Sequence, residues 1–295
     1  MSCEIDTKTK NKSIEKSKSN RIDSLANRYL ELNRFSGTIA VKRSDSVIYH
    51  QSFGLADYEN KIPFSDKTAF KIGQITELIT WSILNKLVKK EKNELSDSVS
   101  QYFSELKSDL TVEDLLNQSF YSSNTKDEID FNTLGRLIEK VSGKSYQENI
   151  KEYGDDLELE NTYFQKEDSS AAIGYLFHNY RGNGLELQKS PSFNPEIAFS
   201  SKGIKSTAND LIKIVSTDVT KELELDGYLE TDGFSYSLVK KSNDKIIIIV
   251  LSNRRHPVAK EISNSIEAIL KNEEYKVPLS RKPFSINSKL LEDYS

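Results

Sequence analysis

Hydrophobic positions recur along this chain with two periods, about 3.6 residues in some segments and two residues in others. The longer period predicts amphipathic helices over 20–33 and 258–270. Segments with the shorter period, or with continuous β-branched residues, predict strands. These strands pair into two hairpins with polar turns, 37–42 with 47–53 and 234–239 with 246–251.

Between the two hairpins the pattern changes to helices and loops. Residues 77–90 are apolar on almost every side in their first half, which predicts a central helix buried on several sides. The order of elements predicts an α+β fold, in which an antiparallel sheet is flanked by N- and C-terminal helices and carries a helical insert. Shorter helices are expected over 112–116, 131–141 and, after the capping residues Ser206 and Thr207, 208–215, and residues 151–200 are expected to be mostly loop.

Composition divides the chain into three segments. Residues 1–19 are rich in Lys, Ser and Asn and poor in apolar residues, so we expect a disordered polar tether there. Residues 20–275 carry the periodic patterns and form the expected folded domain. Residues 276–295 are expected to be a C-terminal linker or tail.

Charge and cysteine content exclude several classes of function. The 41 basic and 45 acidic residues give a net charge of −4 and are interspersed, which disfavours nucleic acid as a partner. No stretch approaches the roughly 20 apolar residues of a membrane-spanning helix, and the first residues lack the apolar run of a secretory signal. A single cysteine allows neither an internal disulfide nor a cysteine-based metal cluster, and we expect no metal and no cofactor.

The one cysteine, Cys3, heads the polar arm. A cysteine before a polar tether is typical of a processed bacterial lipoprotein, in which lipid on the thiol anchors a soluble domain to a membrane. The alternative is an incidental free thiol. An apolar leader encoded upstream of Met1 would support a lipid anchor at Cys3, and its absence would exclude one.

Several segments carry a resemblance to a known family. They read FSGTIAV at 35–41, FGLA at 53–56, FKIG at 70–73, LGRLIEKVSG at 134–143 and STANDL at 206–211. In order and spacing they resemble serine β-lactamase-like hydrolases related to class C β-lactamases and penicillin-binding proteins. The resemblance implies the fold of that family and a bacterial protein of the cell envelope or periplasm, although no signal peptide is present in this chain.

Members of this family acylate a serine, and the first motif that the resemblance implies is S-x-x-K at the start of a helix. The lysine lies one turn after the serine and takes its proton. Here the two positions hold Gln74 and Glu77. An amide is no nucleophile at neutral pH, and a carboxylate has no hydroxyl to activate. Thr76 lies about 200° around the helix from Gln74 and points away from that face.

The second motif, Y-x-N, is implied at a fixed distance before the LGRLIEKVSG segment, where this chain has Lys126-Asp127-Glu128. Tyr121 and Ser122 lie too early and have the wrong spacing. We keep Tyr121, Ser122 and Lys126, together with Gln74 and Glu77, as candidate residues of a binding cleft. A pair between Glu77 and Lys126 would be one way to line it.

The third motif, H-x-G or K-x-G, is implied on the strand that borders the cleft. The nearest candidate is Leu225-Asp226-Gly227, which has neither histidine nor lysine at Leu225. The stretch between Ile214 and Gly233 is also short for the family, so we expect a strand and its connection to be deleted. That strand would otherwise bind substrate backbone by β-augmentation.

These losses predict a catalytically inactive member of the family, a pseudoenzyme that serves at most as a binding or scaffold protein of the cell envelope for a small-molecule or peptide ligand. Two alternatives remain open. One is an active serine hydrolase, a peptidase, an esterase or a β-lactamase-like enzyme, that uses displaced residues such as Tyr121 or Ser122. The other is a truncated relic without a selected function.

Overall fold

A computed structural model describes residues 2–91, 96–103, 110–117, 131–164, 168–179, 185–191, 195–255 and 257–280. Within these ranges no helix is both long enough and apolar enough to cross a membrane. The helices are α1 (Ser2–Glu31), α2 (Ile75–Glu91), α3 (Val99–Tyr102), α4 (Val112–Asn117), α5 (Phe131–Ser142), α6 (Tyr146–Asp156), α7 (Pro195–Lys202), α8 (Ala208–Val215), the 3-10 helix η1 (Asp218–Thr220) and α9 (Val258–Lys271).

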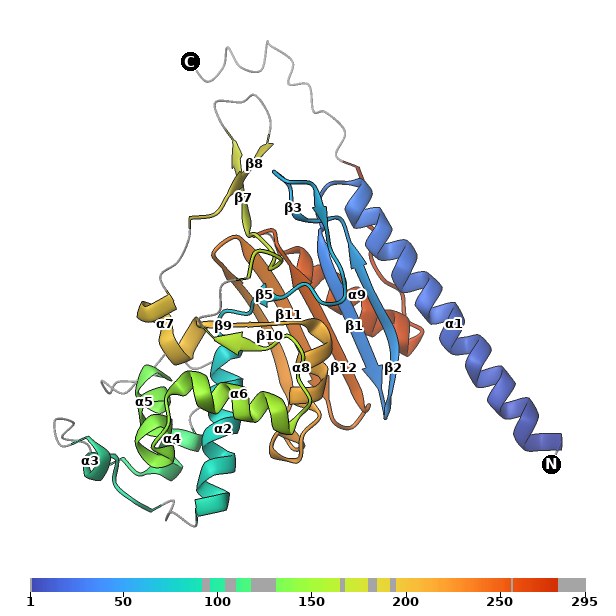
Figure 1. Ribbon diagram of the computed structural model, residues 1–295. Coiled ribbons are helices and arrows are strands. Elements are labelled where there is room, and N and C mark those ends of the chain that lie inside the picture. The colour runs from blue at the N-terminus through green and yellow to red at the C-terminus, as the bar shows by residue number, and fades with distance from the viewer. Residues whose placement is uncertain are drawn as a thin grey trace, which may run out of the picture.

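A five-stranded antiparallel sheet forms the centre of the fold (Figure 1), with the strand order β10-β11-β12-β1-β2. The two predicted hairpins meet along β1 and β12, where Gly37 pairs with Ser252 and Arg43 with Ile246. Segments from opposite ends of the chain therefore lie side by side, and the predicted α+β fold is confirmed. The strands are β1 (Gly37–Arg43), β2 (Ser46–Phe53), β10 (Leu225–Thr231), β11 (Phe234–Lys241) and β12 (Ile246–Ser252).

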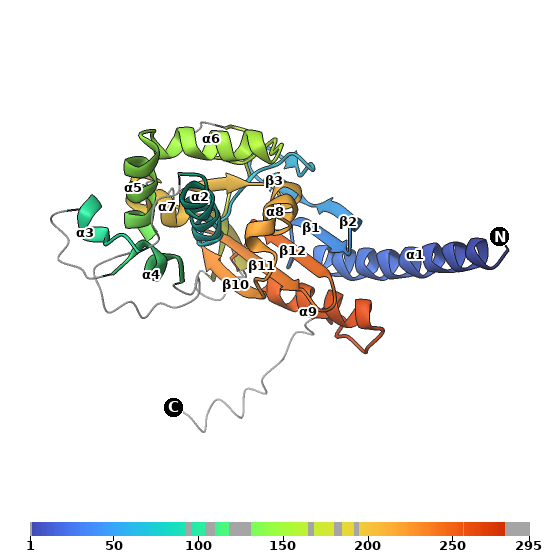
Figure 2. The same ribbon diagram turned by 90° about the horizontal axis from the view of Figure 1, so that it is seen from below.

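Side chains alternate between the two faces of this sheet, and each face has its own apolar core. Ile248 and Val250 of β12 pack in the core formed with α1 and α9, whereas Ile249 and Leu251 pack in the core formed with α2 and α8. Figure 2 shows the sheet between α9 on one side and α2 and α8 on the other. Because helices cover both faces, every residue of β12 is buried.

The helical insert lies on the α2 side of the sheet, together with several short strands. Residues 151–200 hold more regular structure than the mostly looped segment that we expected, including β6, β7 and β8. Local periodicity does not reveal strands of two to five residues, because their partners, such as β9 for β6, are distant in sequence. The short strands are β3 (Leu55–Asp57), β4 (Ile62–Pro63), β5 (Phe70–Lys71), β6 (Tyr163–Phe164), β7 (Tyr175–Asn179), β8 (Leu185–Lys189) and β9 (Ile204–Ser206).

Helix α1 begins earlier than the sequence predicts. It runs from Ser2, so residues 2–19 are helical, in contrast to the disordered tether that their composition indicates. Lys18 is 4% exposed and its Nζ donates to the carbonyl of Leu270 at 2.6 Å, in the last turn of α9. Ser19 Oγ donates to the carbonyl of Ile48 at 3.1 Å. Carbonyls at a helix end and on an edge strand thus accept polar side chains that composition alone assigns to solvent.

Strand β10 is present, and the expected deletion of the strand at this edge is wrong. Leu225 pairs with Lys240 and Thr231 with Phe234, so β10 and β11 form a continuous hairpin. Its turn holds Asp232 at φ 46° and Gly233 at φ 82°. Two consecutive residues with positive φ are typical of a two-residue hairpin turn, and such a turn needs no long connection.

Candidate functional site

The segment with Gln74 and Glu77 links β5 to α2. Tight backbone bonds form the turn: the N–H of Thr76 donates to the carbonyl of Gly73 at 3.0 Å, and that of Glu77 to the carbonyl of Gln74 at 3.0 Å. Gln74 is exposed, and Glu77, three residues later, is only 7% exposed. The fold therefore presents the Gln74 amide to solvent and places the Glu77 side chain in the protein interior.

The β10–β11 hairpin lies against this turn. Gly73 has a φ of +53°, and a Cβ built on it would lie 2.7 Å from Tyr236 Oη and 2.8 Å from Thr231 Cγ2. Glycine is therefore required twice, for the left-handed backbone and for the close approach of two side chains. Thr231 and Tyr236 are neighbours of the site that the sequence did not reveal. The alternation of β11, which buries Phe234, Tyr236 and Leu238 in the α2-side core, was the available signal.

The predicted third motif lies at the wrong end of β10. Leu225 and Gly227 are buried near the start of the strand, whereas Thr231, at its end, lies against Gly73. Six residues of extended chain separate Leu225 from Thr231, about 20 Å at roughly 3.3 Å per residue. The residues of β10 that border the start of α2 are therefore those near Thr231, and Leu225 and Gly227 have no place in a cleft at Gln74.

Two hydroxyls near this turn, those of Thr76 and Tyr236, are buried. Thr76 is fully buried, and its Oγ1 accepts a hydrogen bond from the N–H of Ile204 at 3.3 Å, so it points away from Gln74 as predicted. Tyr236 Oη is buried and has no hydrogen-bond partner among the described residues. Burial raises the pKa of Tyr236 well above its ordinary value, so the phenol stays protonated at neutral pH.

The remaining candidate residues, Tyr121, Ser122, Lys126 and Glu128, lie outside the described residues. The loss of the second motif and the pairing of Glu77 with Lys126 therefore stay predictions. Within the described ranges no group of three or more His, Cys, Asp or Glu side chains is arranged to hold a metal ion.

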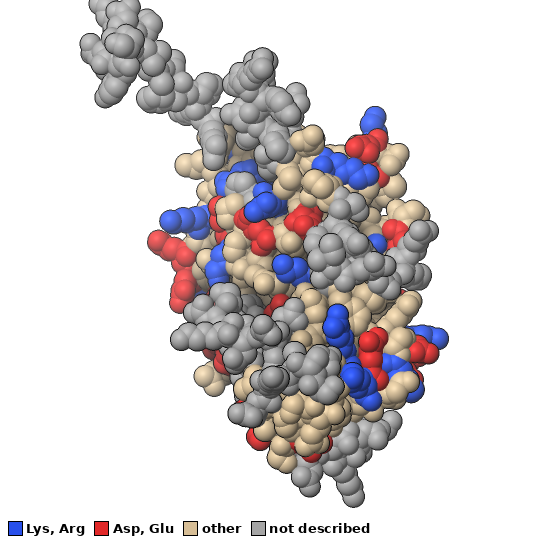
Figure 3. Space-filling model, turned by 90° about the vertical axis from the view of Figure 1, so that its left-hand side faces the viewer, with Lys and Arg blue, Asp and Glu red and all other residues tan. Residues whose placement is uncertain are grey.

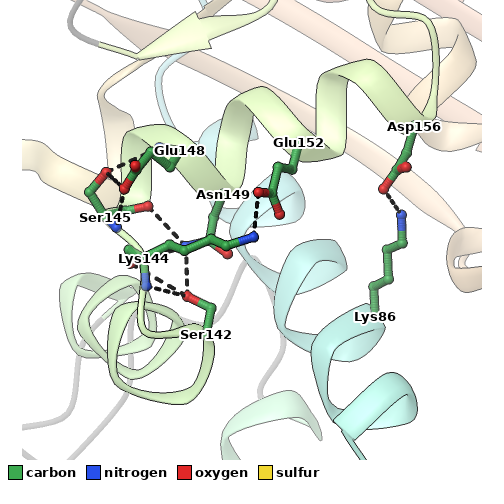
Figure 4. Close-up of polar contacts among 8 residues, drawn as sticks. All are labelled: Lys86, Ser142, Lys144, Ser145, Glu148, Asn149, Glu152 and Asp156. Carbon is green, nitrogen blue, oxygen red and sulfur yellow. Dashed lines mark hydrogen bonds and ion pairs between the residues drawn. The ribbon is translucent and has the colours of Figure 1, made fainter.

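Helix α2 is held firmly beneath the site. Thr80 Oγ1 lies 2.7 Å from Tyr146 Oη and 2.7 Å from the carbonyl of Ser200, and all of these contacts are buried. Helix α6, which carries Tyr146, begins with a capping box in which Ser145 and Glu148 satisfy each other's backbone N–H groups (Figure 4). Lys86 of α2 forms an ion pair with Asp156 at the other end of α6, also drawn in Figure 4.

Comparison with known proteins identifies the family. A sequence profile described as Beta-lactamase matches residues 22–233, well over half of the chain. The chain belongs to the β-lactamase family. The predicted resemblance is therefore confirmed, and the frame around Gln74 and Glu77 is that of a β-lactamase-family protein.

Within the β-lactamase family, the chain is similar in sequence to several curated proteins. It is 26% identical over 222 residues to a teichoic acid D-alanine hydrolase of Staphylococcus aureus (strain MRSA252), a match that covers 64% of this chain and 55% of that protein. The chain spans about half the length of the curated relatives it matches.

Two crystal structures share the fold. FmtA from Staphylococcus aureus superposes with a TM-score of 0.67 at 20% identity, covering 92% of this chain and 93% of that chain. A β-lactamase/D-alanine carboxypeptidase from Pseudomonas syringae superposes with a TM-score of 0.68 at 14% identity, covering 88% and 99%. At these identities the likeness extends to the fold alone.

Proposed function

We propose that this protein is a catalytically silent member of the β-lactamase family that binds a ligand at the start of α2 without forming an acyl-enzyme. The observation that carries the proposal is the pair Gln74 and Glu77, which stand where the family resemblance implies the nucleophilic serine and its lysine. Acylation needs a nucleophile and a group that accepts its proton. The exposed amide of Gln74 is no nucleophile, so the buried Glu77 carboxylate has no hydroxyl from which to take a proton.

The relatives suggest the ligand to test first. Because the matched Staphylococcus aureus proteins are named for removing D-alanine from teichoic acid, we propose D-alanylated teichoic acid as the ligand, bound without cleavage. Such a role places the protein in the cell envelope. The lipid anchor on Cys3 belongs to the same proposal, and mass spectrometry of the protein purified from its native membrane fraction would detect a lipid on that thiol.

Intact mass after incubation with a fluorophosphonate and with a β-lactam tests the silent site. A class C β-lactamase treated in parallel must gain the fluorophosphonate adduct, and we expect no adduct of either reagent on this protein. Gln74→Ser combined with Glu77→Lys should also gain no stoichiometric adduct, because the other two motifs stay absent. A stoichiometric adduct on the unmodified protein would refute the proposal, and an adduct on the double variant would show that the supporting motifs are present.

A second assay separates binding from turnover. Release of D-alanine from D-alanylated teichoic acid should stay at the level of a buffer control, while the protein still sediments with that polymer. Release that Ser122→Ala abolishes would favour the alternative, a hydrolase that uses displaced residues. If the protein shows neither release nor co-sedimentation, a relic without a selected function becomes the better account, and a non-cooperative thermal unfolding curve would agree with it.

A further inference from the structure

A pocket rich in lysine lies far from the Gln74 site. It has a volume of about 330 Å³ and is lined by Lys42, Lys221, Lys240, Lys241 and Lys245. Two acidic residues, Asp45 and Glu222, also line it, so five minus two leaves a local formal charge of +3 in a chain whose net charge is −4. On the face of the molecule in Figure 3, by contrast, the described basic and acidic side chains are interspersed.

Two hairpin turns build one wall of the pocket. The N–H of Ser44, in the β1–β2 turn, donates to the carbonyl of Lys245, in the β11–β12 turn, at 2.7 Å. The end of α8 lies opposite, where Ser216 Oγ accepts a hydrogen bond from Lys42 Nζ at 2.9 Å. Both turns lie at the lower end of the sheet in Figure 1. Segments that are distant in sequence thus converge on one fixed cavity.

The position of the pocket separates it from the Gln74 site. Tyr236, which lies beside Gly73, and Lys240 are on the same strand and the same face of β11. Four residues of extended chain separate them, about 13 Å at roughly 3.3 Å per residue. A ligand in this pocket would therefore not contact the start of α2.

One of the lysines that line the pocket, Lys240, is buried. Lys240 is 7% exposed, and its Nζ donates to the carbonyls of Thr220 and Lys221. An ammonium group has three N–H donors, so two carbonyls leave one donor for a ligand. Among the described residues Lys241 is the one lysine of the five that forms an ion pair, with Asp226. Buried lysines are rare unless they are paired. Glu222 and Glu224 lie near Lys240 without forming an ion pair with it among the described residues, so a bound anion would supply a direct partner.

We propose that this pocket binds a small anion with two or more negative charges on oxygen, of the size of a diphosphate. The lysine ammonium groups and the hydroxyl of Ser44, which line the same cavity, can donate hydrogen bonds to phosphate oxygens. Because Asp226 pairs with Lys241, the lining charge of +3 falls to +2, which a dianion would match and a monoanion would offset only in part. The volume also exceeds what a single phosphate fills and reaches the lower end of the range for small-molecule sites.

Calorimetric titration with inorganic pyrophosphate tests the site. The pocket variant combines Lys221→Gln with Lys245→Asn, two exposed lysines, and asparagine suits the left-handed φ of 50° at position 245. The matched control combines Lys89→Gln with Lys151→Gln, exposed lysines on α2 and α6, and changes the net charge by the same amount. We expect saturable one-site binding by the unmodified protein and the control, and at least tenfold weaker binding by the pocket variant.

Salt and competing anions sharpen the test. Binding should weaken as ionic strength rises, because exposed lysines are screened, and sulfate should compete better than acetate at equal ionic strength. Cooperative thermal unfolding of both double variants would show that they are folded. The proposal is overturned if the unmodified protein shows no saturable binding, if the pocket variant and the control bind equally, or if acetate competes as well as sulfate.

Discussion

Replacing Gly73 by alanine tests the packing of the β10–β11 hairpin against the start of α2. The φ of Gly73 is +53°, and the new Cβ would lie 2.7 Å from Tyr236 Oη and 2.8 Å from Thr231 Cγ2. A left-handed backbone costs a residue with a side chain about 1–2 kcal/mol. Forcing a methyl group into a filled site adds about 1–3 kcal/mol. We therefore expect Gly73→Ala to lower the free energy of unfolding by about 2–5 kcal/mol.

Gly143 provides a matched control, because its φ is +69° and a Cβ there would meet no atom within 4 Å. Gly143→Ala should lower the free energy of unfolding only through backbone strain, by about 1–2 kcal/mol. Urea unfolding followed by circular dichroism measures both losses. Adding Tyr236→Phe to Gly73→Ala removes the nearer contact and should restore part of the loss, as a double-mutant cycle would show. Equal losses at Gly73 and Gly143 would refute the placement of Tyr236 and Thr231 against this turn.

Two further predictions concern the polar contacts around α2. Tyr236→Phe removes a buried hydroxyl with no partner among the described residues, so it should leave the free energy of unfolding unchanged or raise it by up to about 1 kcal/mol. Tyr146→Phe removes a 2.7 Å contact with Thr80 and should lower the free energy of unfolding by about 1 kcal/mol. Thermal melts of the pair check this, and the opposite order would contradict it. Ser145→Ala should lower the free energy of unfolding by about 1 kcal/mol, because it removes the α6 cap. Ser145→Thr keeps the hydroxyl and should lose less stability, and equal losses for the two variants would contradict a capping role.

The parts of the fold that the sequence predicted well are those in which local pattern and tertiary burial agree. The two hairpins were predictable because each strand finds its partner a few residues away. The isoleucine run of β12 indicated a strand covered on both faces, and α1 and α2 do lie on opposite faces of the sheet. Gln74 and Glu77 were identified by position within a family frame, which requires no knowledge of their surroundings.

The errors share a cause, since each concerns a contact between residues distant in sequence. Lys18 and Ser19 look like tether residues until the carbonyls of Leu270 and Ile48 are brought beside them. The edge strand β10 seemed deleted because its length was judged from the chain between two motifs, whereas a two-residue turn lets that short stretch suffice.

The sequence by itself determined that the chain has the β-lactamase-family frame and that an amide and a carboxylate replace the serine and lysine of its first motif. Only the tertiary structure decided which end of β10 borders that position, that Tyr236 lies beneath Gly73, and that lysines from four segments share one pocket. The physical reason is that residue type at a motif is a local property, whereas strand register and burial follow from which distant segments pack together.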